Sequence, residues 1–166
     1  MSFPHILDAR QFTRDWLESV LFPRAAKLQA TPAGQFAHPL AGKRLFYLFY
    51  EPSTRTRVSF EMAASLLGAS VTGMDSFEHR PEDELLEDRI RVLNEYPYDF
   101  LLLRYHEEGG ASRAAAVSHV PVINAGDGPG QHPTAEPSAA RESVKSKIKS
   151  MEEGERREEM GARRSR

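Results

Sequence analysis

Between residues 45 and 124 the chain alternates short apolar runs with segments of helical periodicity, and this alternation constrains the fold more than any other feature. The apolar runs cover 45–50, 69–74, 100–103 and 121–124, which are strand lengths. Segments 54–67, 82–95 and 111–118 have helical spacing, and Leu85, Leu86, Ile90 and Leu93 fall on one side of the second. Strands that alternate with helices favour βαβ units. The sequence therefore predicts an α/β fold, a parallel sheet flanked by helices on both faces.

A further helix is predicted before this region. Thr13 can cap it, and Trp16, Leu17, Val20, Leu21 and Leu28 then follow at the spacing of an apolar packing stripe. Pro23 interrupts the pattern and should kink or split the helix, because an interior proline removes a backbone hydrogen bond.

Length and composition set the class of protein. The chain has 166 residues, enough for one domain with a core, and its net charge of −2 gives no overall field that favours nucleic acid or a membrane surface. It has no Cys, which excludes disulfides, thiolate metal sites and a cysteine nucleophile. The N-terminus lacks a signal-peptide pattern, and no apolar run has transmembrane length. We expect a cytoplasmic protein.

The composition changes after Thr134. In 135–166 half of the residues are charged and none is aromatic, so apolar positions are too sparse for a core. We therefore predict two regions: a folded domain over 1–134, and a disordered, charged, low-complexity tail over 135–166. Arg163 and Arg164 form a basic cluster for which nucleic-acid contact is an alternative, but a solvated tail is favoured.

The most informative stretch is 49–68, which reads FYEPSTRTRVSFEMAASLLG. Pro52 ends a strand pattern, and Val58, Met62, Leu66 and Leu67 then follow at helical spacing. Residues 53–57 therefore fall at the start of a helix, where free backbone N–H groups and the helix dipole favour an anion. Arg55 adds a planar fork that suits phosphate oxygens. The alternative is that the hydroxyls only cap the helix and the arginines are solvated.

The motif E-P-S-T-R-T-R-x-S-F-E resembles the carbamoyl-phosphate signature of the aspartate and ornithine carbamoyltransferases. Two later segments extend the resemblance, LLLRYHEEGGA at 101–111 and VPVINAGDGPGQHPT at 120–134. The resemblance implies that Ser53, Thr54, Arg55 and Thr56 bind the phosphate of carbamoyl phosphate. It also implies that Thr56, Arg104 and His132 face the carbamoyl oxygen. The turn at 53–56, the turn at 104–106 and the loop at 126–134 all follow predicted strands, so they should meet at one edge of the sheet.

The implied activity is transfer of the carbamoyl group from carbamoyl phosphate to the amine of L-aspartate, in pyrimidine biosynthesis. No metal or organic cofactor is implied, and the family forms homo-oligomers, as trimers. The N-A-G-D-G and R-x-H-x-E-G forms are more similar to aspartate than to ornithine carbamoyltransferases. An ornithine carbamoyltransferase fragment remains an alternative, as does a non-catalytic module for phosphate binding or oligomerisation.

The sequence also departs from the family pattern. The resemblance covers 3–134, which is the carbamoyl-phosphate half of a two-domain family. Ala135 stands where the family has a glutamine that contacts the carbamoyl nitrogen. The segment 76–82 lacks the lysine of a loop that reaches a neighbouring subunit, and Arg80 is the one candidate to replace it. These departures predict that this chain alone is a poor catalyst.

Overall fold

The computed structural model describes residues 5–32, 34–76, 84–129 and 132–133. All of these lie in the first of two units into which the chain divides, Met1–Thr134 and Ala135–Arg166. The tail predicted for 135–166 lies outside the described residues, as does Arg80.

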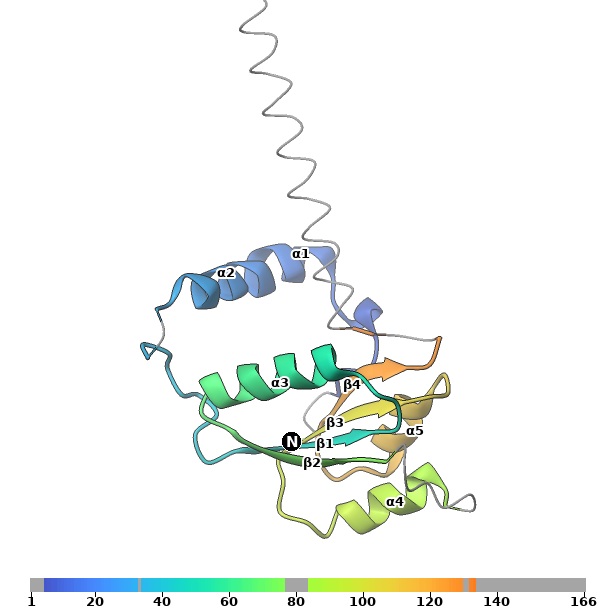
Figure 1. Ribbon diagram of the computed structural model, residues 1–166. Coiled ribbons are helices and arrows are strands. Elements are labelled where there is room, and N and C mark those ends of the chain that lie inside the picture. Colours follow the sequence, from blue (N-terminus) through green and yellow to red (C-terminus); the bar gives the residue numbers. More distant parts are fainter. Residues whose placement is uncertain (1–4, 33, 77–83, 130–131, 134–166) are drawn as a thin grey trace, which may run out of the picture. The chain divides into compact units, whose positions relative to one another are not determined.

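A four-stranded parallel sheet forms the centre of the first unit (Figure 1). Its strands lie in the order β2-β1-β3-β4, and every neighbouring pair is parallel. Their bounds are Arg44–Phe49 for β1, Ser70–Asp75 for β2, Phe100–Tyr105 for β3 and Val122–Asp127 for β4. The predicted parallel sheet is therefore confirmed. The strands β3 and β4 run further than predicted, because their pairing continues to Tyr105 and Asp127.

Helices cover both faces of the sheet (Figure 1). Helix α3, Thr54–Leu66, lies on one face, whereas α4, Leu86–Leu93, and α5, Gly110–Val117, lie on the other. Successive residues of β3 point to opposite faces, so Leu101 and Leu103 pack with α4 and α5 while Leu102 packs on the α3 side. All three leucines are buried, and each contributes about 1.5–3 kcal/mol through removal from water.

One prediction about a helix face was wrong. Leu85 is 60% exposed, because it is the extended residue that precedes α4 and does not belong to its buried stripe. In α3 the apolar side chains at helical spacing do not face the sheet. Val58, Met62 and Leu66 are exposed, and the small residue Ala64 makes the close contact with the strands.

The N-terminal helix divides into three pieces, α1 over Arg14–Trp16, a π-helical turn η2 over Leu17–Leu21, and α2 over Phe22–Ala30. Thr13 caps it as predicted, accepting a hydrogen bond from the Trp16 N–H at 3.2 Å. The Phe22 N–H donates to the Leu17 carbonyl five residues earlier, and this π-turn accommodates Pro23 in the first turn of α2. The interruption predicted at Pro23 therefore takes the form of a π-turn just before the proline, without a break in the helical run.

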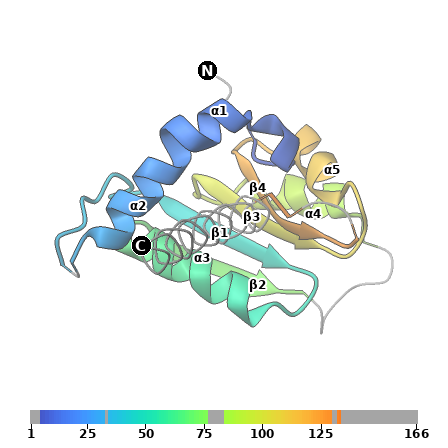
Figure 2. The ribbon, with the colours of Figure 1, turned by 90° about the horizontal axis from the view of Figure 1, so that it is seen from above.

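The helical run α1–η2–α2 stands beyond α3 on the same side of the sheet (Figure 1). Seen from above, it runs in a different direction from α3 (Figure 2). No residue of these pieces is buried, and Trp16 and Leu28 are exposed. Leu17, Val20 and Leu21 are half-buried, so the expected packing stripe is only partly covered. None of the helices in the described part of the chain is long and apolar enough to span a membrane.

Candidate functional site at the carboxyl ends of the strands

The carboxyl ends of β1, β3 and β4 meet at one edge of the sheet, because these three strands are adjacent and parallel. Each end carries residues that the sequence singled out. The turn 50–53 follows β1 and leads into α3, Arg104 lies near the end of β3, and Gly126 lies near the end of β4. Arg104 and Gly126 were expected in loops, but both are strand residues in the structure. The expectation that the segments share an edge is confirmed.

A bulge in β4 faces Arg104. Leu103 pairs with Asn124 and Tyr105 pairs with Asp127, so Arg104 alone stands opposite the two residues Ala125 and Gly126. An extra residue of this kind bends a strand and re-aims the side chains around it. Here the bulged strand presents the Ala125 carbonyl to Arg104, whose Nη1 donates a hydrogen bond to it at 2.9 Å.

The Arg104 guanidinium also joins the end of β4 to the end of β1. Its Nη2 lies 3.3 Å from Oε2 of Glu51, and the arginine side chain keeps only 22% of its exposure. The arginine is therefore held from two sides, by a backbone carbonyl and by a carboxylate. Glu51 was not predicted to take part in the site. Its place directly after the strand pattern 45–50 is the signal that could have identified it. In a parallel sheet, residues that follow adjacent strands lie close together at the carboxyl edge.

Gly126 brings Arg104 and His132 together. Its φ of +117° is a conformation that side chains rarely adopt. A Cβ atom there would collide with Arg104 Nη1 and would lie 3.5 Å from Cδ2 of His132. The guanidinium and the imidazole thus both lie against the same glycine. Two of the predicted site residues are neighbours for this reason.

The first turn of α3 is open toward solvent at the same edge. Ser53 is the residue that precedes the helix, and its side chain makes no capping hydrogen bond within the described structure. Thr54 and Arg55 are exposed, and Thr56 is half-buried. The Ser53 hydroxyl therefore does not cap the helix, which was the alternative to an anion site. Residues 54–56 lie on α3, whereas Arg104 and His132 lie against Gly126 of β4, so the site has two halves built on different elements.

A hollow of about 240 Å³ lies beside this helix start, lined by Phe49, Pro52, Ser53, Thr54, Arg57 and Asp75. Arg57 Nη1 lies 2.6 Å from Oδ2 of Asp75, which ties α3 to the end of β2. This ion pair occupies Arg57, whereas the Arg55 guanidinium has no such partner among the described residues. Of the two arginines in the motif, Arg55 is the one available to a ligand. We call Ser53–Thr56 together with Arg104, Gly126 and His132 the strand-end site.

Arg89 of α4 forms hydrogen bonds with the residues on either side of 77–83, the segment that follows β2. Its Nη1 donates to Ser76 Oγ at 2.6 Å, and its Nε donates to Glu84 Oε2 at 2.7 Å. The guanidinium also lies 5.6 Å from the ring centre of Tyr50, and burial raises the pKa of that tyrosine to about 12. Residues 77–83 between the two anchor points, with Arg80, lie outside the described residues.

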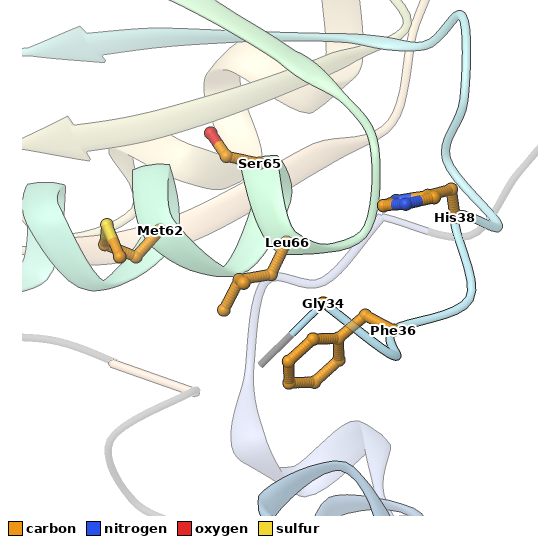
Figure 3. A pocket seen from close by; sticks show the side chains of 6 residues that line it. All are labelled: Gly34, Phe36, His38, Met62, Ser65 and Leu66. Carbon is orange, nitrogen blue, oxygen red and sulfur yellow. The ribbon is translucent and has the colours of Figure 1, made fainter. Parts of the chain in front are cut away.

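A second hollow of about 240 Å³ lies at the other end of α3 (Figure 3). It is lined by Gly34, Phe36, His38, Met62, Ser65 and Leu66. Its lining includes no Asp, Glu, Lys or Arg, and only His38 and Ser65 are polar, so it does not suit a charged ligand such as phosphate. In the described part of the chain no cluster of His, Asp and Glu side chains is arranged to hold a metal ion.

A family model and several known proteins match the folded part of this chain. The family model described as "Aspartate/ornithine carbamoyltransferase, carbamoyl-P binding domain" matches residues 4–136. The chloroplastic aspartate carbamoyltransferase of Oryza sativa subsp. japonica is 44% identical over 138 residues, which cover 78% of this chain and 38% of the rice protein. The aspartate carbamoyltransferase catalytic subunit of Methanocella arvoryzae is 44% identical over 132 residues, covering 78% of this chain and 42% of that protein.

Solved structures show the same relationship. The catalytic subunit of M. jannaschii aspartate transcarbamoylase is similar with a TM-score of 0.70 and 37% identity, covering 80% of this chain and 44% of that chain. Aspartate transcarbamoylase from Trypanosoma cruzi in complex with carbamoyl phosphate and aspartate has a TM-score of 0.68 and 33% identity, covering 80% and 44% of the two chains. The present chain therefore spans about two fifths of the length of these relatives.

Proposed function

This chain belongs to the aspartate/ornithine carbamoyltransferase family, and we propose that its strand-end site binds carbamoyl phosphate for transfer of the carbamoyl group to L-aspartate. The observation that carries the proposal is the meeting of Arg104 and His132 on Gly126, at the sheet edge where the uncapped start of α3 also lies. One half of the site suits a phosphate, and the other half suits a polar oxygen.

The phosphate would bind at the first turn of α3. Backbone N–H groups there have no partner within the helix, and the dipole favours a negative charge. Ser53, Thr54 and Thr56 add hydroxyl donors, and Arg55 adds a charged fork for two phosphate oxygens. Asp75 is the nearest acid in the hollow, and its ion pair with Arg57 reduces its repulsion of the ligand.

The carbamoyl oxygen would bind at the other half. The neutral amine of aspartate attacks the carbamoyl carbon, the C=O double bond opens, and negative charge builds on its oxygen. The double bond then re-forms as the bond from carbon to the phosphate oxygen breaks, and the proton lost from the nitrogen leaves with the phosphate. Arg104, His132 and Thr56 are the donors proposed to face that charge. A donor aimed at a developing oxyanion typically lowers the barrier by about 3 kcal/mol. Arg104 must first exchange its Glu51 contact, 3.3 Å long, for the ligand.

The acceptor half of the reaction needs groups that the described residues do not supply. Orientation of two reactants accounts for roughly 7–11 kcal/mol of a bimolecular barrier, so a chain that binds only carbamoyl phosphate would be almost inactive. We propose that the aspartate carboxylates are bound by a region equivalent to the rest of the relatives' length. Aspartate is preferred over ornithine as the acceptor because the relatives described above are aspartate carbamoyltransferases.

Assembly and location belong to the same proposal. A homo-oligomer, as a trimer, is consistent with the exposed apolar side chains Val58, Met62 and Leu66 on α3. We propose a cytoplasmic location, as expected from the sequence, although the rice relative is named as chloroplastic. Neither metal nor organic cofactor takes part in the proposed step.

Calorimetric titration with carbamoyl phosphate tests the proposal. The wild-type chain should bind, and Arg55→Ala should abolish detectable binding because the charged fork is lost. Arg14→Ala is the matched control, since Arg14 lies on α1, is 83% exposed and pairs only with Glu18 in the described structure. Equal binding by wild type and Arg55→Ala would refute the assignment.

A further inference from the structure

Asn124 is a fully buried polar residue in the middle of β4, next to the bulge. Its side chain uses both ends of the amide. The Oδ1 atom accepts a hydrogen bond from the Gly126 N–H at 2.8 Å, and the Nδ2 group donates to the Leu7 carbonyl at 3.0 Å. A buried amide that has partners at both ends specifies one local geometry, because any other arrangement leaves polar atoms unpaired.

The contact with Gly126 bears directly on the bulge. A bulge interrupts the regular ladder and leaves an extra residue unpaired, and Gly126 also has the strained φ of +117°. The Asn124 side chain gives the Gly126 N–H a partner inside the same strand. It thereby stabilises the backbone conformation against which Arg104 and His132 both lie.

The hydrogen bond to Leu7 connects Asn124 to the N-terminal segment, which is itself hydrogen-bonded to β4. Residues 5–7 run along the outer edge of β4. The Ile6 N–H donates to the Val122 carbonyl and the Asn124 N–H donates to the Ile6 carbonyl, each at 2.8 Å. His5 Nδ1 accepts a further hydrogen bond from the Val122 N–H at 3.0 Å. Asn124 is therefore held between the N-terminal segment on one side and the bulge on the other.

We propose that Asn124 is a positioning residue that holds the β4 bulge so that Arg104 and His132 face the carbamoyl group. This inference rests on the proposed function and adds a separable consequence. The bulge supports only the carbamoyl half of the strand-end site, whereas the phosphate half is built on α3. Loss of the Asn124 lock should therefore weaken binding of carbamoyl phosphate while leaving binding of inorganic phosphate unchanged.

The test compares two probes, freshly dissolved carbamoyl phosphate and inorganic phosphate, by calorimetric titration of the full chain. Asn124→Ala should weaken carbamoyl phosphate binding by about tenfold, the value of one hydrogen bond to a charged donor, with no change for phosphate. Asn124→Asp keeps an acceptor for the Gly126 N–H but loses the amide donor to the Leu7 carbonyl, so it should recover only part of the affinity. His5→Ala is the control, because it loosens the same edge without touching the bulge.

Three outcomes would overturn the inference. Equal affinity of wild type and Asn124→Ala for carbamoyl phosphate would remove the positioning role but leave the proposed function intact. A parallel loss of both probes would make Asn124 merely structural. Binding of neither probe by wild type would reject the proposed function together with the inference. Should Asn124→Ala not fold, hydrogen exchange of the wild-type Gly126 amide decides: protection like that of the β3 amides supports the lock, and rapid exchange refutes it.

Discussion

Replacement of Gly126 by alanine tests the packing at the centre of the site. The new Cβ would enter the space that Arg104 Nη1 occupies, and it would also touch His132. The guanidinium would have to move, with loss of its 2.9 Å hydrogen bond to the Ala125 carbonyl. The φ of +117° adds backbone strain that is independent of this collision.

The expected cost has two parts that can be separated. Strain from a side chain at such a φ is about 1–3 kcal/mol. Loss of a hydrogen bond from a charged donor adds about 1.5–3 kcal/mol, at the lower end here because the Arg104 side chain remains 22% exposed. Gly42→Ala gives a minimum for the first part. Gly42 has no atom within 4 Å of the added Cβ, and its φ of 76° lies closer to the left-handed region that side chains can adopt.

Urea denaturation measures the difference. Gly126→Ala should be less stable than Gly42→Ala by about 1.5–3 kcal/mol, seen as a lower midpoint with an unchanged slope. Its affinity for carbamoyl phosphate should also fall, whereas Gly42→Ala should bind like the wild type. Equal stability and equal binding of the two variants would show that Arg104 does not pack against Gly126, which would contradict the proposed site.

Three further predictions concern other parts of the molecule. Glu51→Gln removes the carboxylate that competes for Arg104, so carbamoyl phosphate should bind about two- to fivefold more tightly in a titration, and weaker binding would contradict this. The Arg113 guanidinium hydrogen-bonds to Glu87 and lowers the pKa of that carboxyl from 4.5 to about 2. The pair therefore stabilises the fold above pH 4.5 and loses this effect as the pH falls toward 2. In denaturation curves wild type should exceed Glu87→Gln by about 1 kcal/mol near neutral pH, with the gap closing in acid, and a constant gap would refute it. Met62 is 58% exposed on α3, so light scattering should detect self-association that Met62→Glu reduces, whereas a wild type that stays monomeric at high concentration would count against an interface there.

The sheet was predictable because each strand is a short apolar run between helical segments. Every predicted strand exists, and the strands run parallel because a helix lies between each consecutive pair. The strand ends were less predictable. Arg104 and Asp127 looked like loop residues by composition, but pairing with a neighbouring strand extends β3 and β4 through them. Helical spacing also did not show which side of α3 is buried, because the sheet contact uses Ala64 and leaves Met62 exposed.

The sequence indicated which residues form the site, but not how the backbone brings them together. Motif resemblance pointed to Arg55, Arg104 and His132, and the structure places the last two against one glycine. The bulge that produces this contact depends on how two strands pair, and a single sequence does not show register. The buried amide of Asn124 was hidden for the same reason, since its partner at Leu7 lies 117 residues away along the chain.

The most direct test of the central claim is an NMR titration of the isotope-labelled chain with carbamoyl phosphate. Binding at the strand-end site predicts the largest amide shifts at residues 53–56 together with Arg104, Gly126 and His132, from segments that meet only in the folded sheet. Inorganic phosphate should shift residues 53–56 alone. Shifts that cluster elsewhere, or carbamoyl phosphate shifts that leave Arg104 and Gly126 unchanged, would contradict the account.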